Sequence, residues 1–302
     1  MRSRWALVAI MLVLGTGWGS TQSTGKLAVS TGHAPFGVIF WQLAIATVLL
    51  GGLTLARGRR PLLTQAALRF YVIVAFLGTL IPNLAFYVSI THLSAGVMAI
   101  IISLVPMLAL PMSVALGMDR FSPMRLAGLG LGLTGVVLIA WSGGEVSNDL
   151  SPGWLALAVV GPVFYAMEGT YVARNGTAGM EAMTAMLGAS AAGMVICLPV
   201  ALVSGQFFWP PLPFGVAEWS LVVMSVSHAC LYAGYVWLAV RAGAVFASQT
   251  SYVVTGTGVF WAMLLLGERF PPLVWLALVV MLSGVALVQP RQKQAEGDAC
   301  LV

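Results

Sequence analysis

The chain has 302 residues, of which 60% are hydrophobic and only 8% are charged, and its mean hydropathy is +0.97. Soluble globular proteins carry roughly 25% charged residues, so we expect this surface to face lipid rather than water. The net charge of +5 does not indicate a nucleic-acid partner, because the basic residues are spread between apolar segments instead of forming one patch.

Ten apolar segments follow one another along the chain, separated by glycine, proline and charged residues. Each is close to the ~20 residues that a helix needs to cross the hydrocarbon. The first follows Arg2 and Arg4 and can be read as a secretory signal peptide, but we favour an uncleaved helix because the segment continues to Val29. The predicted spans are 5–29, 35–56, 68–91, 94–117, 123–142, 153–174, 182–204, 217–240, 244–266 and 272–289.

The positions of the basic residues support this count, because cytoplasmic loops retain lysine and arginine. With the N-terminus inside, twelve of the fourteen basic residues fall in inner segments. Lys26 and Arg269 are the two exceptions. We therefore predict an integral protein of a bacterial-type plasma (inner) membrane, with both termini cytoplasmic.

The two halves of the chain are related by a repeat. A shift of 149 residues gives eight identities over residues 117–138. Five helices per half is an odd number, so the second copy must cross the membrane in the opposite sense. The sequence predicts an all-α membrane protein of ten helices in two inverted repeats around a central cavity. The predicted boundaries are 1–142 for the first repeat, 143–152 for an outer linker, 153–290 for the second repeat and 291–302 for a cytoplasmic tail.

An acid–arginine–phenylalanine motif follows the fourth and the ninth predicted helices. It reads Asp119-Arg120-Phe121-Ser122-Pro123 in the first copy and Glu268-Arg269-Phe270-Pro271-Pro272 in the second. Proline at a helix start loses no hydrogen bond, and the preceding acid lies near the positive end of the helix. We interpret each copy as a tight interhelical turn rather than as a catalytic acid.

These motifs, together with Gly17-Trp18-Gly19-Ser20 in the first helix and the glycine-rich fifth and tenth helices, resemble the EamA-type branch of the drug/metabolite transporter superfamily. The resemblance covers nearly the whole chain. It implies ten helices around a central cavity and the export or exchange of amino acids or similar metabolites. One departure is Met118-Asp119, where the family usually has the Gly–Glu pair that stands at Gly267-Glu268 in the second copy.

Glu168, in the sixth predicted helix, is the leading candidate for a residue of the substrate pathway. Tyr165 and Tyr171 share its helix face at i−3 and i+3. A charge at the bilayer centre costs at least about 2.5–3.5 kcal/mol, so the carboxylate should face protein or water. It can bind a substrate ammonium group or carry a coupling proton. The alternatives are a structural pair and a side chain that reaches the inner interface.

The eighth predicted helix has a polar and aromatic stripe suited to lining a cavity. His228 is its centre and a second candidate proton carrier, with Ser225, Tyr232 and Tyr235 on the same side. A hydrogen-bonded structural histidine is the alternative reading.

The first and third helices have similar polar faces, for which cavity lining and polar packing between helices are both open. Lys26 can attract a carboxylate or extend to the interface, and Pro82 should free a backbone carbonyl. The candidates on these two helices are Trp18, Gln22, Lys26, Thr79, Asn83 and Tyr87.

The sequence predicts a secondary transporter of amino acids or similar small polar metabolites that works by alternating access, with proton coupling as a variant. The expected partners are the lipid bilayer, a small-molecule substrate and protons, in a monomer or a homodimer. The three cysteines have no metal-ligand spacing and no catalytic motif occurs, so we expect no metal, cofactor or catalytic residue. Two alternatives stay open, a membrane-embedded enzyme and a non-transporting sensor or scaffold.

Overall fold

The protein is seen here as a computed structural model that describes residues 2–118, 123–142, 151–242 and 250–288. Over these ranges every regular element is helical. The helices are α1 (Arg2–Ala28), α2 (Pro35–Ala56), α3 (Gln65–Ala75), η1 (Phe76–Leu80), α4 (Ile81–Ser89), α5 (Ala95–Ile101), α6 (Leu104–Ala115), α7 (Pro123–Trp141), α8 (Pro152–Asn175), α9 (Ala182–Val203), α10 (Val216–Ala242), α12 (Thr250–Leu266) and α13 (Pro272–Val288).

These helices form the ten predicted spans. The third span is α3, η1 and α4 together, and the fourth is α5 and α6. Five spans are long and apolar enough to cross a membrane, and shorter apolar helices occupy four more. The predicted boundaries agree to within a few residues, except that residues 244–249 of the ninth span lie outside the described ranges. The same is true of 143–150 in the predicted linker and of the predicted tail.

Two spans are interrupted where proline removes a backbone donor. In the third span, η1 is one π-helical turn that ends just before Pro82, and such turns often mark functional sites. In the fourth span, α5 ends at Ile101 and α6 starts at Leu104, just before Pro106. The freed backbone carbonyl expected from Pro82 agrees with the interruption of the third span.

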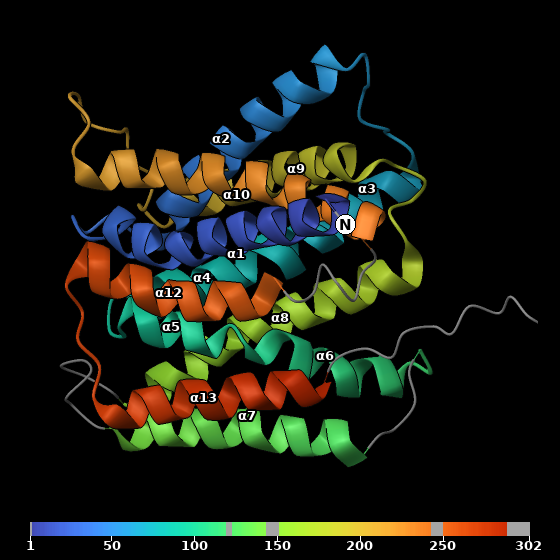
Figure 1. Cartoon of the computed structure of the whole chain (residues 1–302). Coiled ribbons are helices and arrows are strands. Elements are labelled where there is room, and N and C mark those ends of the chain that lie inside the picture. The colour runs from blue at the N-terminus through green and yellow to red at the C-terminus, as the bar shows by residue number, and fades with distance from the viewer. Residues whose placement is uncertain (1, 119–122, 143–150, 243–249, 289–302) are drawn as a thin grey trace, which may run out of the picture.

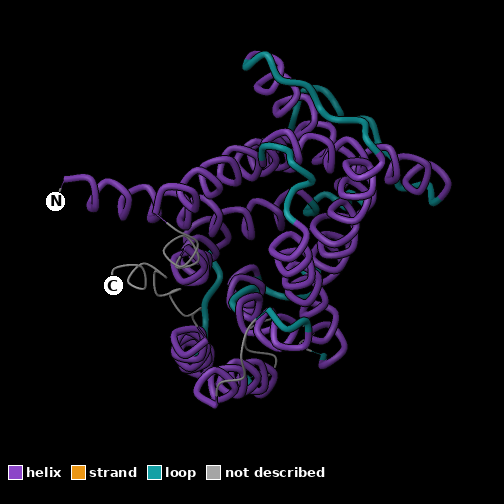
Figure 2. Tube along the Cα trace, turned by 90° about the vertical axis from the view of Figure 1, so that its right-hand side faces the viewer, coloured by secondary structure: helices purple, strands orange, loops and turns teal. Residues whose placement is uncertain are grey.

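The packing between helices has the symmetry of an inverted repeat. Helix α1 packs against α10 and α12, and its repeat partner α8 packs against α4 and α6, which belong to the corresponding spans of the other half. The pairs α2–α9 and α7–α13 join corresponding helices directly. Figure 1 shows α7 and α13 side by side at the lower edge, where they remain after the 90° turn in Figure 2. Each half therefore completes the packing of the other.

Glycine permits the close approach between α7 and α13. A Cβ atom at Gly284 would lie 2.6 Å from the carbonyl oxygen of Gly128, so this crossing needs a residue without a side chain. Close packing of α7 against α13 thus explains why the fifth and tenth spans are rich in glycine.

A layer of buried apolar residues lies near the C-terminal end of α1. Ala28, Ile39, Ile90 and Leu93 are all fully buried there, and Leu221 is 3% exposed. They belong to one hydrophobic cluster that includes residues of both repeats. We call this the closed end of the bundle.

Candidate functional site

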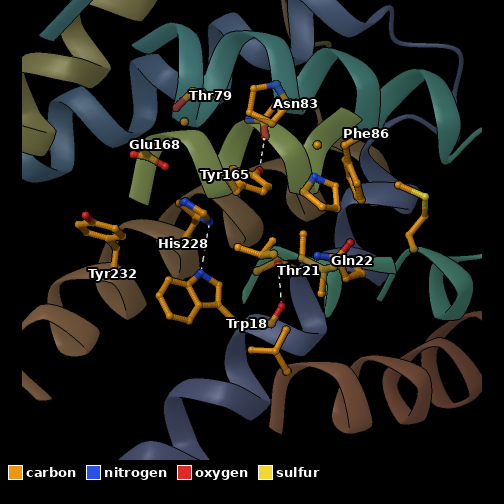
Figure 3. A pocket seen from close by; sticks show the side chains of 18 of the residues that line it. Trp18, Thr21, Gln22, Thr79, Asn83, Phe86, Tyr165, Glu168, His228 and Tyr232 are labelled. Atoms are coloured by element: carbon orange, nitrogen blue, oxygen red, sulfur yellow. Dashed lines mark hydrogen bonds between the residues drawn. The ribbon is translucent and has the colours of Figure 1, made fainter. Parts of the chain in front are cut away.

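A cavity of about 300 Å³ lies between the two repeats. Its walls come from α1, α2, the third and fourth spans, α8, α9, α10 and α12. Figure 3 shows side chains from several of these helices pointing into one space. This is the location that inverted-repeat transporters use for substrate, at the interface between their halves.

Most of the predicted pathway residues meet in this cavity. The ten that line it are Trp18, Gln22, Thr79, Asn83, Tyr87, Tyr165, Glu168, His228, Tyr232 and Tyr235. Their functions stay predictions. The helical spacings on the first, third, sixth and eighth spans therefore converge on one space.

Three predicted residues lie elsewhere. Lys26 Nζ is 2.9 Å from Glu268 Oε1 and donates to the carbonyl of Leu93. Tyr171 packs in a separate cluster with Phe70, and Ser225 donates to the carbonyl of Leu221, one turn earlier on its own helix. Lys26 lies two turns beyond Trp18, about 12 Å further along the axis of α1, where its ammonium group pairs with Glu268.

Glu168 lies against the π-helical turn of the third span. A Cβ atom at Gly78 would be 2.5 Å from Glu168 Oε1, so the carboxylate occupies the space that a side chain would fill. Among the described residues that line the cavity, Glu168 is the one acid, and none is lysine or arginine. No side chain or backbone group in the described ranges donates a hydrogen bond to it. A carboxylate in this setting is available to a cation or a proton.

Aromatic side chains surround the approach to Glu168. Trp18 Nε1 lies 3.4 Å from His228 Nδ1, which makes Nδ1 the acceptor and leaves the ring hydrogen of a neutral His228 on Nε2. Trp18 also meets Tyr235 edge-on, with ring centroids 5.5 Å apart. Figure 3 shows His228 and Tyr232 near Glu168, with Phe86 and Gln22 on the other side of the cavity. Aromatic faces of this kind attract cations.

A chain of hydrogen bonds joins three helices on another wall. Tyr165 donates to Asn83 Oδ1 at 3.1 Å, and Asn83 Nδ2 donates to Gln42 Oε1 at 3.0 Å. Tyr87 donates to the same Gln42 oxygen at 2.8 Å. Gln42 was missed by the sequence reasoning. Its signal was available, because it is the one amide side chain in the apolar span of α2.

The interhelical turn between α12 and α13 has a second role beyond the predicted one. The Glu268 carboxylate accepts hydrogen bonds from the backbone of Ala95 at 2.8 Å and of Gly96 at 3.1 Å. Glu268 therefore caps the N-terminus of α5, which satisfies donors that a helix start leaves unpaired. The first copy of the motif, at Asp119-Arg120-Phe121-Ser122, lies outside the described residues.

Further contacts fasten the closed end. His33 Nε2 lies 2.7 Å from Glu218 Oε1, and the ring of His33 stacks on Phe208. Gln206 accepts from the backbone of Phe36 at 3.1 Å, and Trp41 Nε1 donates to the carbonyl of Phe208 at 2.8 Å. The loop after α9 thus folds over the start of α2.

Metal ligation has no support in the described part of the chain. No group of three His, Cys, Asp or Glu side chains lies close enough there to hold an ion. Cys197 is buried and donates to the carbonyl of Phe36, while Cys230 is exposed.

Comparisons with known proteins agree with the repeat. The EamA-like transporter family matches residues 4–141 and again residues 152–289. Two curated relatives, from Chlamydia trachomatis serovar L2 and serovar D, are each named S-adenosylmethionine/S-adenosylhomocysteine transporter. Each is 25% identical over 284 residues, which cover 90% of this chain and 85% of the relative. A solved crystal structure with 15% identity matches with a TM-score of 0.61, over 94% of this chain and 97% of that one.

Proposed function

This chain belongs to the EamA-like transporter family, and we propose that it carries amino-acid-type metabolites with a positively charged group across a bacterial-type inner membrane, with both termini in the cytoplasm. The family and the relatives make it an integral membrane transporter of small metabolites. S-adenosylmethionine and S-adenosylhomocysteine are the first candidates, because the relatives are named for them.

One observation carries the proposal. The cavity between the repeats presents the Glu168 carboxylate, with no lysine or arginine among its described lining residues, inside a wall of aromatic rings. An ammonium or sulfonium group is attracted both by the carboxylate and by the faces of the rings. A phosphorylated metabolite finds neither lysine nor arginine among the described residues of those walls.

The closed end of the bundle is the part that must open during transport. In our proposal the buried layer around Ala28, Ile90 and Leu93 is the barrier between the cavity and one side of the membrane. Alternating access requires that this layer opens while the opposite end closes, by rocking of one repeat against the other. The direction of net transport then follows the substrate gradient or exchange against protons at Glu168.

Uptake into proteoliposomes tests the proposal. Purified protein should give saturable uptake of labelled S-adenosylmethionine or S-adenosylhomocysteine above empty liposomes, with the common amino acids as a comparison panel. Glu168→Gln should raise KM about tenfold or more, since a hydrogen-bonded charge contact contributes about 1.5–3 kcal/mol. Glu181→Gln is the matched control, because Glu181 pairs with Arg59 outside the cavity. Failure of every compound to exceed empty liposomes would overturn the proposal.

A further inference from the structure

We propose that the side-chain amide of Gln42 binds a hydrogen-bond acceptor at the far end of the transported molecule, opposite the cationic group held by Glu168. This inference rests on the proposed function and adds a second recognition point. The chemical class is an elongated amine or sulfonium metabolite with a carboxylate or heteroaromatic nitrogen at its other end.

The carbonyl oxygen of Gln42 is fully used inside the protein. It accepts one hydrogen bond from Asn83 Nδ2 and one from the Tyr87 hydroxyl, and an amide oxygen has two lone pairs. Asn83 Oδ1 in turn accepts from the Tyr165 hydroxyl, so each member of this chain has a partner. The Gln42 amide is therefore held with its oxygen toward the third span.

The amide nitrogen of Gln42 is the group left for a ligand. Gln42 lines the cavity although it is only 8% exposed, and its Nε2 has no acceptor among the described residues. The hydroxyl groups of Thr47 and Thr54, on the same helix, also lack a hydrogen-bond partner, but both are fully buried. Two N–H donors thus reach the cavity from a fixed support.

The third span sets the distance between the two recognition points. Glu168 lies over Gly78, whereas Gln42 is bonded to Asn83 and Tyr87, five and nine residues further along. At about 1.5 Å per residue, this separation is roughly 7–14 Å along the helix. The Glu168 carboxylate accepts hydrogen bonds, whereas the Gln42 amide nitrogen only donates them. The cavity therefore favours one orientation of a molecule that has a cation at one end and an acceptor at the other.

The test replaces the donor without changing the shape of the side chain. Gln42→Glu keeps an acceptor for Asn83 and Tyr87 but presents a charged oxygen to the cavity, and Gln42→Met removes both the donor and that acceptor without adding charge. Three transported probes show whether the acceptor bound by Gln42 is the carboxylate or the adenine ring. They are S-adenosylmethionine, decarboxylated S-adenosylmethionine, which lacks the carboxylate, and S-methylmethionine, which lacks the adenine ring. KM for each is measured in proteoliposomes, and elution from a sizing column confirms the fold of each variant.

Both variants should raise KM for S-adenosylmethionine about tenfold, the size expected for one lost hydrogen bond. If Gln42 binds the carboxylate, KM for S-methylmethionine should rise by the same factor, and KM for the decarboxylated compound should not change. If the adenine ring is bound, the pattern of those two probes is reversed. Thr54→Val, on the same helix and buried away from the cavity, should leave all three unchanged.

Equal effects on all three probes, or no effect on any, would overturn the assignment of Gln42 while leaving the proposed function intact. Absence of transport by the unaltered protein would instead overturn the proposed function.

Discussion

The ammonium group of Lys26, at the end of α1, lies 2.9 Å from the Glu268 carboxylate in the turn between α12 and α13. The same carboxylate caps α5 through the backbone of Ala95 and Gly96. One acid thus connects three spans at the closed end. The Lys26 side chain is 33% exposed and that of Glu268 only 12%, so the cap is the better protected of the two interactions.

Glu268→Gln should therefore lower the thermal midpoint of the protein in detergent. Loss of a helix cap costs about 0.5–2 kcal/mol, and the amide replaces one of the two accepting oxygens with an NH₂ group that can only donate. Glu181→Gln, which removes a carboxylate 3.1 Å from Arg59 at an exposed site, should shift the midpoint much less. Equal midpoints for the two variants would show that the cap stabilises the protein no more than the exposed pair of Arg59 and Glu181 does.

Exchanging the charges at the closed end should fail to rescue the protein. In the double variant Lys26→Glu and Glu268→Lys the ion pair is formally restored, but an ammonium group at position 268 would face the N–H groups of Ala95 and Gly96. We expect a thermal midpoint below that of Lys26→Glu alone. The same exchange at Arg59 and Glu181 should be nearly neutral, since both side chains are exposed. A full rescue at the closed end would mean that the ion pair, and not the cap, is the stabilising interaction.

Much of this fold follows from local sequence patterns. Hydropathy predicts all ten spans because lipid requires each to be apolar and helical, and the odd number of helices per repeat makes the second copy inverted. The π-turn at Phe76–Leu80 was not predicted, because hydropathy does not distinguish π-helical from α-helical hydrogen bonding.

The candidate site was predictable where a helix carries several polar residues at helical spacing. Asn83 and Tyr87 are such a pair, and both line the cavity. Gln42 has no periodic companion on α2, so no stripe marked it. The capping role of Glu268 also lies beyond sequence patterns, because its donors are on α5, 172 and 173 residues away.

Gly78→Ala should impair transport by displacing Glu168. The added Cβ atom would lie 2.5–2.8 Å from the carboxylate atoms, so the side chain must rotate away from its position. We expect KM for S-adenosylmethionine to rise about tenfold, as for loss of the carboxylate contact itself. Gly169→Ala is the matched control, because it is next to Glu168 on α8 and a Cβ atom there meets nothing within 4 Å. Similar effects of the two substitutions would argue that helix flexibility, not the position of Glu168, is responsible.

Protons should compete with the substrate cation for Glu168. The carboxylate has no donor among the described residues and can hold either a proton or a cation, but not both. As the pH on the substrate side falls, KM of the unaltered protein should rise while the maximal rate stays constant. In Glu168→Gln, KM should be high and independent of pH. A pH gradient should no longer drive accumulation by this variant, although exchange at saturating substrate persists, because a glutamine cannot release a proton.

His228→Gln separates the two candidate proton carriers, Glu168 and His228. If the pH dependence disappears in that variant and remains in Glu168→Gln, the competing proton binds His228, and exchange of substrate for protons at Glu168 is excluded.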